Sequence, residues 1–240
     1  MLTKIQGLVI RSVKYGETSL IFDMYTRQYG LASFIVNGAR RPKSKLPSSL
    51  FQLMNWLEMI VYMKDPRSLS RVKEVQMIHY YQHIPFNLHK RSVGLFMTEV
   101  VQKSINENEP NPLLFSFLQD AYLYLDQSMD PIMNFHISFL FELSAYLGFR
   151  PSGEWSETNP FFHLVSGNFV NVAHPLYTLD HSLSKVISDY LTCPKEEGHL
   201  LKVPRDIRHE VLDQIISFFR YHLDRLPEIK THRILAEVFS

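Results

Sequence analysis

The sequence contains one cysteine, Cys193, among 240 residues, and this scarcity limits its chemistry. A single thiol cannot form an internal disulfide, and it cannot supply a zinc site built from several thiolates. No apolar run approaches the roughly 20 residues that a membrane-spanning helix needs. The N-terminus also lacks the apolar segment of a signal peptide. We therefore expect a cytoplasmic protein that does not interact with membranes.

Signatures of several enzyme classes are missing as well. The sequence contains no GxSxG motif, no Walker A motif and no GxGxxG motif. His79 and His83 have the i, i+4 spacing that would place two imidazoles on one face of a helix, but no third metal ligand is evident. We expect no catalytic residue, no metal and no cofactor. A metal-dependent hydrolase that uses these two histidines and a distant carboxylate is kept as an alternative.

What the chain does have is an uneven distribution of charge. The formal net charge is only +1, but residues 1–80 contain 12 lysines and arginines against 5 aspartates and glutamates. Residues 81–240 contain 13 against 19. A basic first third is typical of a protein that binds a polyanion, whereas ordinary scatter of surface charge is the simpler alternative. The change of sign coincides with a change in hydrophobic pattern, which favours the first interpretation.

The pattern of residues 1–80 predicts short strands, because β-forming residues alternate with polar ones between turn signals. The expected strands cover residues 4–13, 19–26, 31–36, 53–63 and 69–78. Closure into a barrel would remove exposed strand edges. We therefore predict an OB-fold, the five-stranded barrel best known for binding oligonucleotides.

The strongest local signal is the segment 38–45, which follows the second of two apolar runs and is rich in cations. These cations are Arg40, Arg41, Lys43 and Lys45. No acidic residue lies between Asp23 and Glu58 to neutralise them locally. Such a cluster can bind phosphates with release of counterions, although a solvated loop is the alternative. We predict six DNA-phosphate contacts, at Lys14, Arg27, Arg40, Arg41, Lys43 and Lys45.

Aromatic side chains near this segment allow two interpretations. Tyr15, Tyr25, Tyr29 and Phe34 could each offer a stacking face to a base, or could lie in the core of the barrel. The sequence does not separate these two roles.

The hydrophobic period becomes helical after His79, so the fold class is α+β with an N-terminal barrel over residues 1–80 and a helical domain over residues 81–240. Expected helices cover residues 87–106, 112–127, 131–147, 180–192, 205–226 and 230–239. Asp130-Pro131 is a helix-start signal, and Gly148 is a helix-end signal. Residues 149–177 lack a helical period, and two short apolar runs around Ser166-Gly167 predict an inserted β-hairpin.

The stretch from Tyr15 to Lys45 resembles the N-terminal signature of the RecO family of bacterial recombination mediators. That signature has a Gly-Glu-Thr-Ser turn, a strand ending in threonine and a second strand, and then Gly-Ala-Arg with further basic residues. Here these features stand as Gly16–Ser19, Thr26, Gly30 and Gly38–Arg41. The C-terminal segment 226–235 is similar to the Leu-Lys-Ser/Thr-Arg ending of the family.

This resemblance implies a non-catalytic role in DNA repair, in the cytoplasm and at the nucleoid. It implies binding of single- and double-stranded DNA, annealing of complementary strands, and contacts with RecR and the single-strand-binding protein. Together with RecR, such a protein helps to load RecA onto coated gaps. Arg220 and Arg225 are our candidates for contacting the acidic tail of the single-strand-binding protein. An OB-fold that binds RNA or serves translation is the alternative function.

One departure from the family pattern concerns zinc. Many members have a zinc finger with four cysteine ligands in the insertion, whereas residues 149–177 contain no cysteine here. The chain therefore resembles a zinc-free variant. We predict that Phe161, Phe162, Phe169 and Val172 replace the metal with a small apolar cluster.

Overall fold

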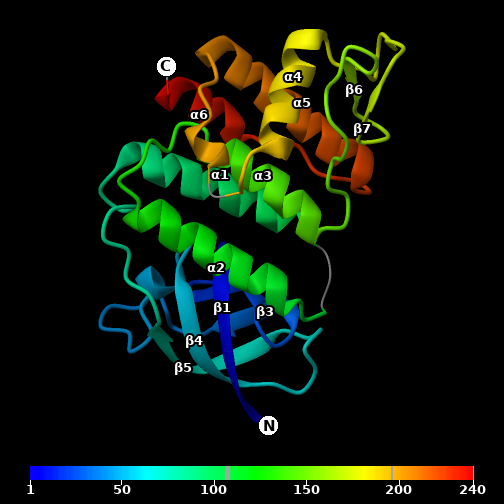
Figure 1. Ribbon diagram of the computed structural model, residues 1–240. Coiled ribbons are helices and arrows are strands. Elements are labelled where there is room, and N and C mark those ends of the chain that lie inside the picture. The colour runs from blue at the N-terminus through cyan, green and yellow to red at the C-terminus, as the bar shows by residue number, and fades with distance from the viewer. Residues whose placement is uncertain (106–108, 196, 240) are drawn as a thin grey trace. The chain divides into compact units, whose positions relative to one another are not determined.

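A computed structural model describes residues 1–105, 109–195 and 197–239 of the chain (Figure 1). It divides into two compact units. The first, here called the barrel unit, comprises Met1–Phe86 and Thr98–Asp126. The second, here called the helical unit, comprises Asn87–Met97 and Gln127–Ser240. In the described part of the chain, no helix is both long and apolar enough to cross a membrane.

Within residues 1–86, all of which are described, five strands close into a barrel in the order β1-β2-β3-β5-β4 (Figure 1). The strands are β1 (Leu2–Tyr15), β2 (Ser19–Thr26), β3 (Gly30–Val36), β4 (Trp56–Tyr62) and β5 (Ser70–Met77). Antiparallel pairing of β1 with β4 closes the barrel, and β3 pairs in parallel with β5. This arrangement confirms the predicted OB-type barrel. A short 3-10 helix, η1 (Ser48–Phe51), lies between β3 and β4.

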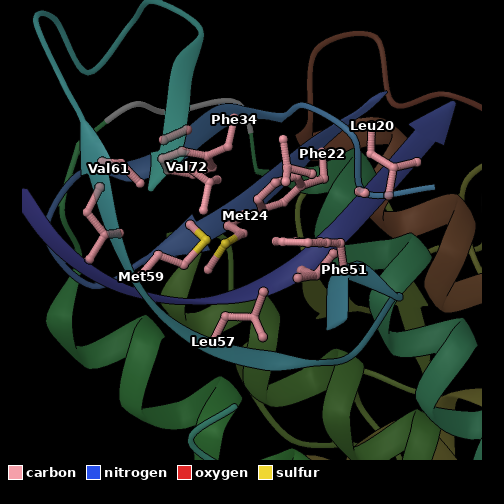
Figure 2. Close-up of a cluster of buried hydrophobic side chains, with 14 of the residues drawn as sticks. Leu20, Phe22, Met24, Phe34, Phe51, Leu57, Met59, Val61 and Val72 are labelled. Atoms are coloured by element: carbon pink, nitrogen blue, oxygen red, sulfur yellow. The ribbon is translucent and has the colours of Figure 1, made fainter. Parts of the chain in front are cut away.

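Alternation along the strands forms the barrel core. In β3 every second residue from Gly30 to Val36 is buried, as expected for a strand with one face toward the interior. Inward-facing side chains from all the strands meet in one cluster, which includes Phe22, Phe34 and Phe51 (Figure 2). Burial of this apolar surface is the main force that closes the sheet.

Gly7 does not interrupt β1, although glycine weakens the interior of a strand. The strand continues from Leu2 to Tyr15 because Gly7 lies where β1 and β2 approach closely. A Cβ atom at this position would lie 2.6 Å from the carbonyl oxygen of Tyr25. The glycine therefore serves close backbone packing rather than a turn.

Helix α2 (Pro112–Gln127) packs against the barrel inside the barrel unit (Figure 1). The ring of Phe115 meets Trp56 edge-on at a centroid distance of 5.4 Å and lies 6.5 Å from Tyr25. Tyr122 lies about two turns further along the same face of α2. Its ring is 6.2 Å from that of Trp56, and its hydroxyl shares a hydrogen bond of 2.7 Å with Thr98. The apolar face of α2 is thus the cover for one side of the barrel.

The helical unit contains the first part of α1 (Leu88–Ser104), followed by further helices and a two-stranded sheet. These elements are α3 (Phe135–Tyr146), β6 (Phe161–His163), β7 (Asn168–Val170), α4 (His181–Thr192), η2 (Gly198–Leu200), α5 (Arg205–His222) and α6 (Thr231–Val238). The predicted hairpin in the insertion is confirmed by the antiparallel pairing of β6 with β7. Residue 106, the last of the predicted first helix, lies outside the described residues.

Two predicted helix ends are wrong. Helix α3 begins at Phe135 rather than at Pro131, because residues 131–134 form a turn in which the Phe135 N–H donates to the carbonyl oxygen of Ile132 at 3.1 Å. Helix α5 ends at His222 rather than at residue 226, because Leu223 adopts an extended conformation with a φ of −114° and a ψ of 123°. The predicted end of α3 at Gly148 is confirmed by its φ of +87°.

Candidate nucleic-acid interface

The cationic segment forms a loop that is anchored to the barrel at several backbone positions. The Arg40 N–H donates to the carbonyl oxygen of Thr18 at 2.9 Å, and Arg40 Nη1 donates to that of Gly16 at 3.2 Å. Ala39 is buried in the barrel core, and its carbonyl oxygen accepts from the Ser48 N–H at 3.0 Å. Arg40 therefore ties the loop to the β1–β2 turn, and the bond between Ser48 and Ala39 joins the two ends of the loop.

Turns inside this loop direct its cations outward. The Arg41 N–H donates to the Gly38 carbonyl oxygen at 3.1 Å, and the Ser44 N–H donates to the Arg41 carbonyl oxygen at 3.3 Å. Gly38 has a φ of +72° and Lys43 a φ of +58°, so the chain reverses twice over a short distance. The solvent-exposed cations of the loop are Arg40, Arg41, Lys43 and Lys45.

One side of the loop borders an open groove of about 710 Å³. Arg41, Lys43 and Lys45 line it from the loop, and Arg71 and Lys73 line it from β5. The parallel pairing of β3 with β5, which sets Ile35 opposite Arg71, explains this arrangement, because it brings the start of β5 beside the end of β3. We call this feature the cationic groove.

Arg71 and Lys73 are missing from the predicted contacts, because they lie about 30 residues after the basic loop in sequence. A signal for them does exist. Val72 between them is buried, so the period of two in β5 directs both cations to the outer face of the barrel. Sequence alone does not predict that this face adjoins the loop.

The cationic groove also contains one acidic and one aromatic side chain of interest. Glu74 pairs with Lys73 at 3.0 Å and, through this hydrogen bond and its charge, raises the pKa of the lysine. Because both side chains are exposed to solvent, the pair leaves Lys73 available to a competing anion. Tyr62 of β4 lies opposite Arg71 in the strand pairing, is 51% exposed and lines the groove.

The remaining predicted phosphate contacts are separated in space. Lys14 is exposed at the end of β1, opposite Leu20, and so adjoins the β1–β2 turn that Arg40 holds. Arg27 is exposed in the turn between β2 and β3, at the other end of β2. At about 3.3 Å per residue, Arg27 is roughly 20 Å from the loop along that strand. The structure therefore groups Lys14 with the basic loop but not Arg27.

Most of the aromatic residues considered for base stacking belong to the core. Tyr25 and Phe34 are buried, so their rings have no accessible stacking face, whereas Tyr29 is partly buried against the barrel core. Tyr15 is 55% exposed. Together with Tyr62, which the sequence analysis did not select, it is an aromatic surface residue of the barrel.

The candidate partner contacts lie in the helical unit. Arg220 is exposed in the last turn of α5, and Arg225 is exposed three residues beyond the end of that helix.

The alternative of a metal-dependent hydrolase requires His79 and His83 to lie on one helix, and these residues do not form a helix. His79 and His83 lie in the irregular segment after β5, where their i, i+4 spacing does not place them on one face. Among the residues that the structure describes, no group of three or more histidine, cysteine, aspartate and glutamate side chains is arranged to hold a metal ion. The helical interpretation of these two histidines is therefore wrong.

The insertion has an apolar core, but its composition differs from the prediction. Phe162 is buried and contacts Phe169 at a centroid distance of 5.2 Å and Phe218 of α5 at 6.0 Å. Phe161 instead lies against His181 at 4.7 Å. Val172 is 70% exposed, so its predicted place in the cluster is wrong. A ring from α5 takes that place, which sequence proximity could not indicate.

Comparison with known families gives two matches, which together cover most of the chain. Residues 1–81 match the family described as "Recombination protein O N terminal", and residues 85–156 match "Recombination protein O C terminal". Similar proteins include the "DNA repair protein RecO" of Phocaeicola vulgatus, 31% identical over 242 residues, and that of Flavobacterium psychrophilum, 32% identical over 241 residues. In both comparisons the whole of each chain is covered.

Proposed function

The chain belongs to the RecO family, and from this premise we propose that it serves DNA repair as a recombination mediator whose barrel binds DNA. The observation that carries the proposal is the cationic groove, where cations from two separate elements face one open space. Arg41, Lys43 and Lys45 come from the loop, and Arg71 and Lys73 come from β5. Cations on both sides of a groove can follow a phosphate backbone, and counterion release provides the driving force.

Single-stranded DNA fits this groove by its chemistry. Its phosphates would contact the loop cations, while an unstacked base would lie against the exposed ring of Tyr62. Lys14 and Arg40 extend the cationic path past the β1–β2 turn. Arg27 stays a predicted phosphate contact, but it lies at the far end of β2, apart from the cationic groove. A DNA strand bound in the groove would reach it only by crossing the barrel surface.

The same electrostatic interaction supports binding of duplex DNA and annealing of complementary strands. Neutralising the phosphates lowers the repulsion between two complementary backbones, and this interaction does not depend on base sequence. We propose a non-catalytic annealing role, because the work lies in bringing strands together and the described residues show no metal group suited to hydrolysis.

The protein partners of this proposal are RecR, the single-strand-binding protein and, indirectly, RecA. Family membership supports them, as does the acidic balance of residues 81–240, which suits protein contacts better than DNA. Arg220 and Arg225 are the proposed contacts for the acidic tail of the single-strand-binding protein. The proposed location is the cytoplasm, at the nucleoid.

The decisive experiment measures annealing of complementary strands, bare or coated with single-strand-binding protein, across a range of salt concentrations. The proposal expects annealing that weakens with salt and is slower for variants of the cationic groove. Titration with labelled single-stranded DNA against unlabelled RNA tests the alternative of an RNA-binding module. Preference for RNA, or annealing that is independent of the groove, would reject the proposal.

A further inference from the structure

The helical unit contains a cavity of about 430 Å³ that the proposed function does not use. Residues of α3, α5 and α6 line it. Its polar lining includes His136, Arg208, His209 and His232, and its apolar lining includes Leu212 and Phe239. Two features of the buried polar groups indicate that the cavity is suited to a ligand.

The first feature is the charge of Arg208, which is only 6% exposed. Its Nη2 donates to the carbonyl oxygen of Val203 at a long 3.4 Å, and its Nε has no hydrogen-bond partner in the described part of the chain. Burial lowers the pKa of Arg208, and the other groups that act on it are Tyr190 and Arg205, neither of which is a carboxylate. A buried guanidinium without a counter-charge is costly, so an anion beside it would stabilise the folded chain.

The second feature is the histidines that share this cavity. His136 is 3% exposed, and its Nδ1 has no partner among the described residues. Burial, reinforced by Arg208 and His209, lowers the pKa of His136 to about 3, so the ring is neutral at physiological pH and can donate one N–H. The Nδ1 of His232 is also buried without a partner within the described ranges. The side chains that carry these three nitrogens come from α3, α5 and α6, and all of them line the one cavity.

We propose that this cavity binds the phosphate group of a small phosphomonoester, of about the size of a nucleoside monophosphate. Arg208 and His136 donate to the phosphate oxygens, and Leu212, Leu235 and Phe239 contact the remainder of the molecule. The planar fork of arginine suits phosphate, and a tetrahedral oxyanion can accept from donors that converge from different helices. Asp213 and Glu237 also line the cavity but are exposed, so they disfavour larger polyanions such as DNA rather than the buried phosphate.

The test is calorimetric titration of the full chain with deoxyadenosine monophosphate, inorganic phosphate and, as the phosphate-free control, deoxyadenosine. We expect saturable binding of the monophosphate with a Kd on the order of 1 mM or lower, weaker binding of phosphate, and none of deoxyadenosine. Arg208→Met keeps an unbranched apolar stem but removes the guanidinium, and it should weaken monophosphate binding by at least about tenfold.

Arg220→Met is the matched control, because Arg220 is an exposed arginine on the same helix that does not line the cavity. It should bind as the unaltered chain does, and so should the groove variant Arg41→Glu/Lys43→Glu. An equal loss of binding in Arg220→Met would overturn the proposal. Retained binding in Arg208→Met, or no saturable binding by the unaltered chain, would also overturn it. If Arg208→Met does not fold, the imidazole NMR signals of His136 in the unaltered chain provide a second test of the proposal. They should shift with added monophosphate and not with sodium chloride, and unmoved signals would overturn the proposal.

Discussion

Arg40 donates from Nη1 to the carbonyl oxygen of Gly16 at 3.2 Å, so the basic loop is tied to the β1–β2 turn by one of its own cations. Arg41, the next residue, lines the cationic groove, and its side chain makes no hydrogen bond within the described residues. Two adjacent arginines therefore have different expected roles. Arg40 contributes to the position of the loop as well as to its charge, whereas Arg41 contributes charge to the groove.

Reversal of two groove charges should weaken DNA binding. Arg41→Glu/Arg71→Glu removes a cation from the loop and one from β5, so about two phosphate contacts are lost. The slope of log K against log salt for single-stranded DNA should become shallower by about 1.4, since each contact contributes about 0.7. Fluorescence anisotropy with a labelled oligonucleotide at several salt concentrations measures both effects.

The matched control for this pair is Lys202→Glu/Arg205→Glu, which changes the net charge equally through exposed residues of the helical unit. It should leave the salt slope within experimental error. Equal weakening by both pairs would mean that net charge, not the cationic groove, governs binding.

Single substitutions should separate the roles of the two adjacent arginines. Arg40→Ala removes the hydrogen bond to Gly16 and should lower the free energy of unfolding by about 0.5–1 kcal/mol, in addition to weakening DNA binding. Arg41→Ala should change that free energy by less than about 0.5 kcal/mol and weaken DNA binding alone. Urea denaturation of both variants checks the difference, and an Arg41→Ala variant that is the less stable one would contradict it.

Asp126 at the end of α2 should be a major contributor to the stability of the barrel unit. Its buried carboxylate accepts from the backbone N–H groups of Gln82, His83 and Ile84 at 2.8–2.9 Å. Asp126→Asn places an amide donor against these donors and should cost about 2–4 kcal/mol at pH 7. Asp120→Asn, on the exposed side of the same helix, is the control and should be nearly neutral in thermal unfolding.

The same aspartate predicts part of the acid sensitivity. Burial alone raises the pKa of Asp126, but the three backbone hydrogen bonds outweigh this and lower it below its usual value. The stabilisation is therefore complete above the pKa of the unfolded chain, near 4, and is lost as the pH falls through the lower folded value. Between pH 5 and pH 3, Asp126→Asn should lose less stability than the unaltered chain. Parallel curves for the two proteins would refute this assignment.

His136 should make the protein less stable in mild acid. The histidine titrates near pH 6.5 in the unfolded chain and at about 3 in the folded one, so the unfolded state binds the extra proton between these values. Stability should fall with decreasing pH in this window, by up to about 1.4 kcal/mol per pH unit. His136→Phe removes the titration and should retain about 1–2 kcal/mol more stability on going from pH 7 to pH 5, measured by denaturant unfolding. No difference between the two proteins over that range would contradict the assignment.

The insertion should be stabilised by its aromatic cluster and not by a metal. Phe162→Ala removes a fully buried ring that contacts Phe169 and Phe218 and should cost about 3–5 kcal/mol. Val172→Ala is the control at an exposed position and should have little effect. Addition of a chelator should leave the Tm of the unaltered chain unchanged. Stoichiometric zinc in the purified protein, by elemental analysis, would contradict the zinc-free interpretation.

Local patterns predicted the barrel well. The run Ser19–Thr26 alternates and β2 has these bounds, and Gly148 ends α3 with the positive φ that its type suggests. Local signals misplaced the start of α3, where the Asp130-Pro131 pair imitates a helix cap, and Gly7 lies inside β1 although glycine disfavours the interior of a strand. In both cases a nearby backbone contact outweighs the intrinsic preference of the residue.

The cationic groove could be predicted only in part. The basic loop is evident from four cations within six residues, but Arg71 and Lys73 join it only through the pairing of β3 with β5. Likewise the sequence could not place Arg27 away from the loop or bury Tyr25 beneath α2. Spacing along a chain reports which residues share a strand face, and it does not report which strands become neighbours.

The amino-acid order by itself determined the strands, the excess of positive charge in the first third and the absence of a cysteine framework, because these depend on residue type and short spacing. Tertiary structure decided which cations surround one groove, which rings remain exposed, and that the buried side chains of Arg208 and His136 line the same cavity. Those outcomes depend on closure of the barrel and on packing of α3, α5 and α6, where residues distant in sequence become neighbours by burying apolar surface.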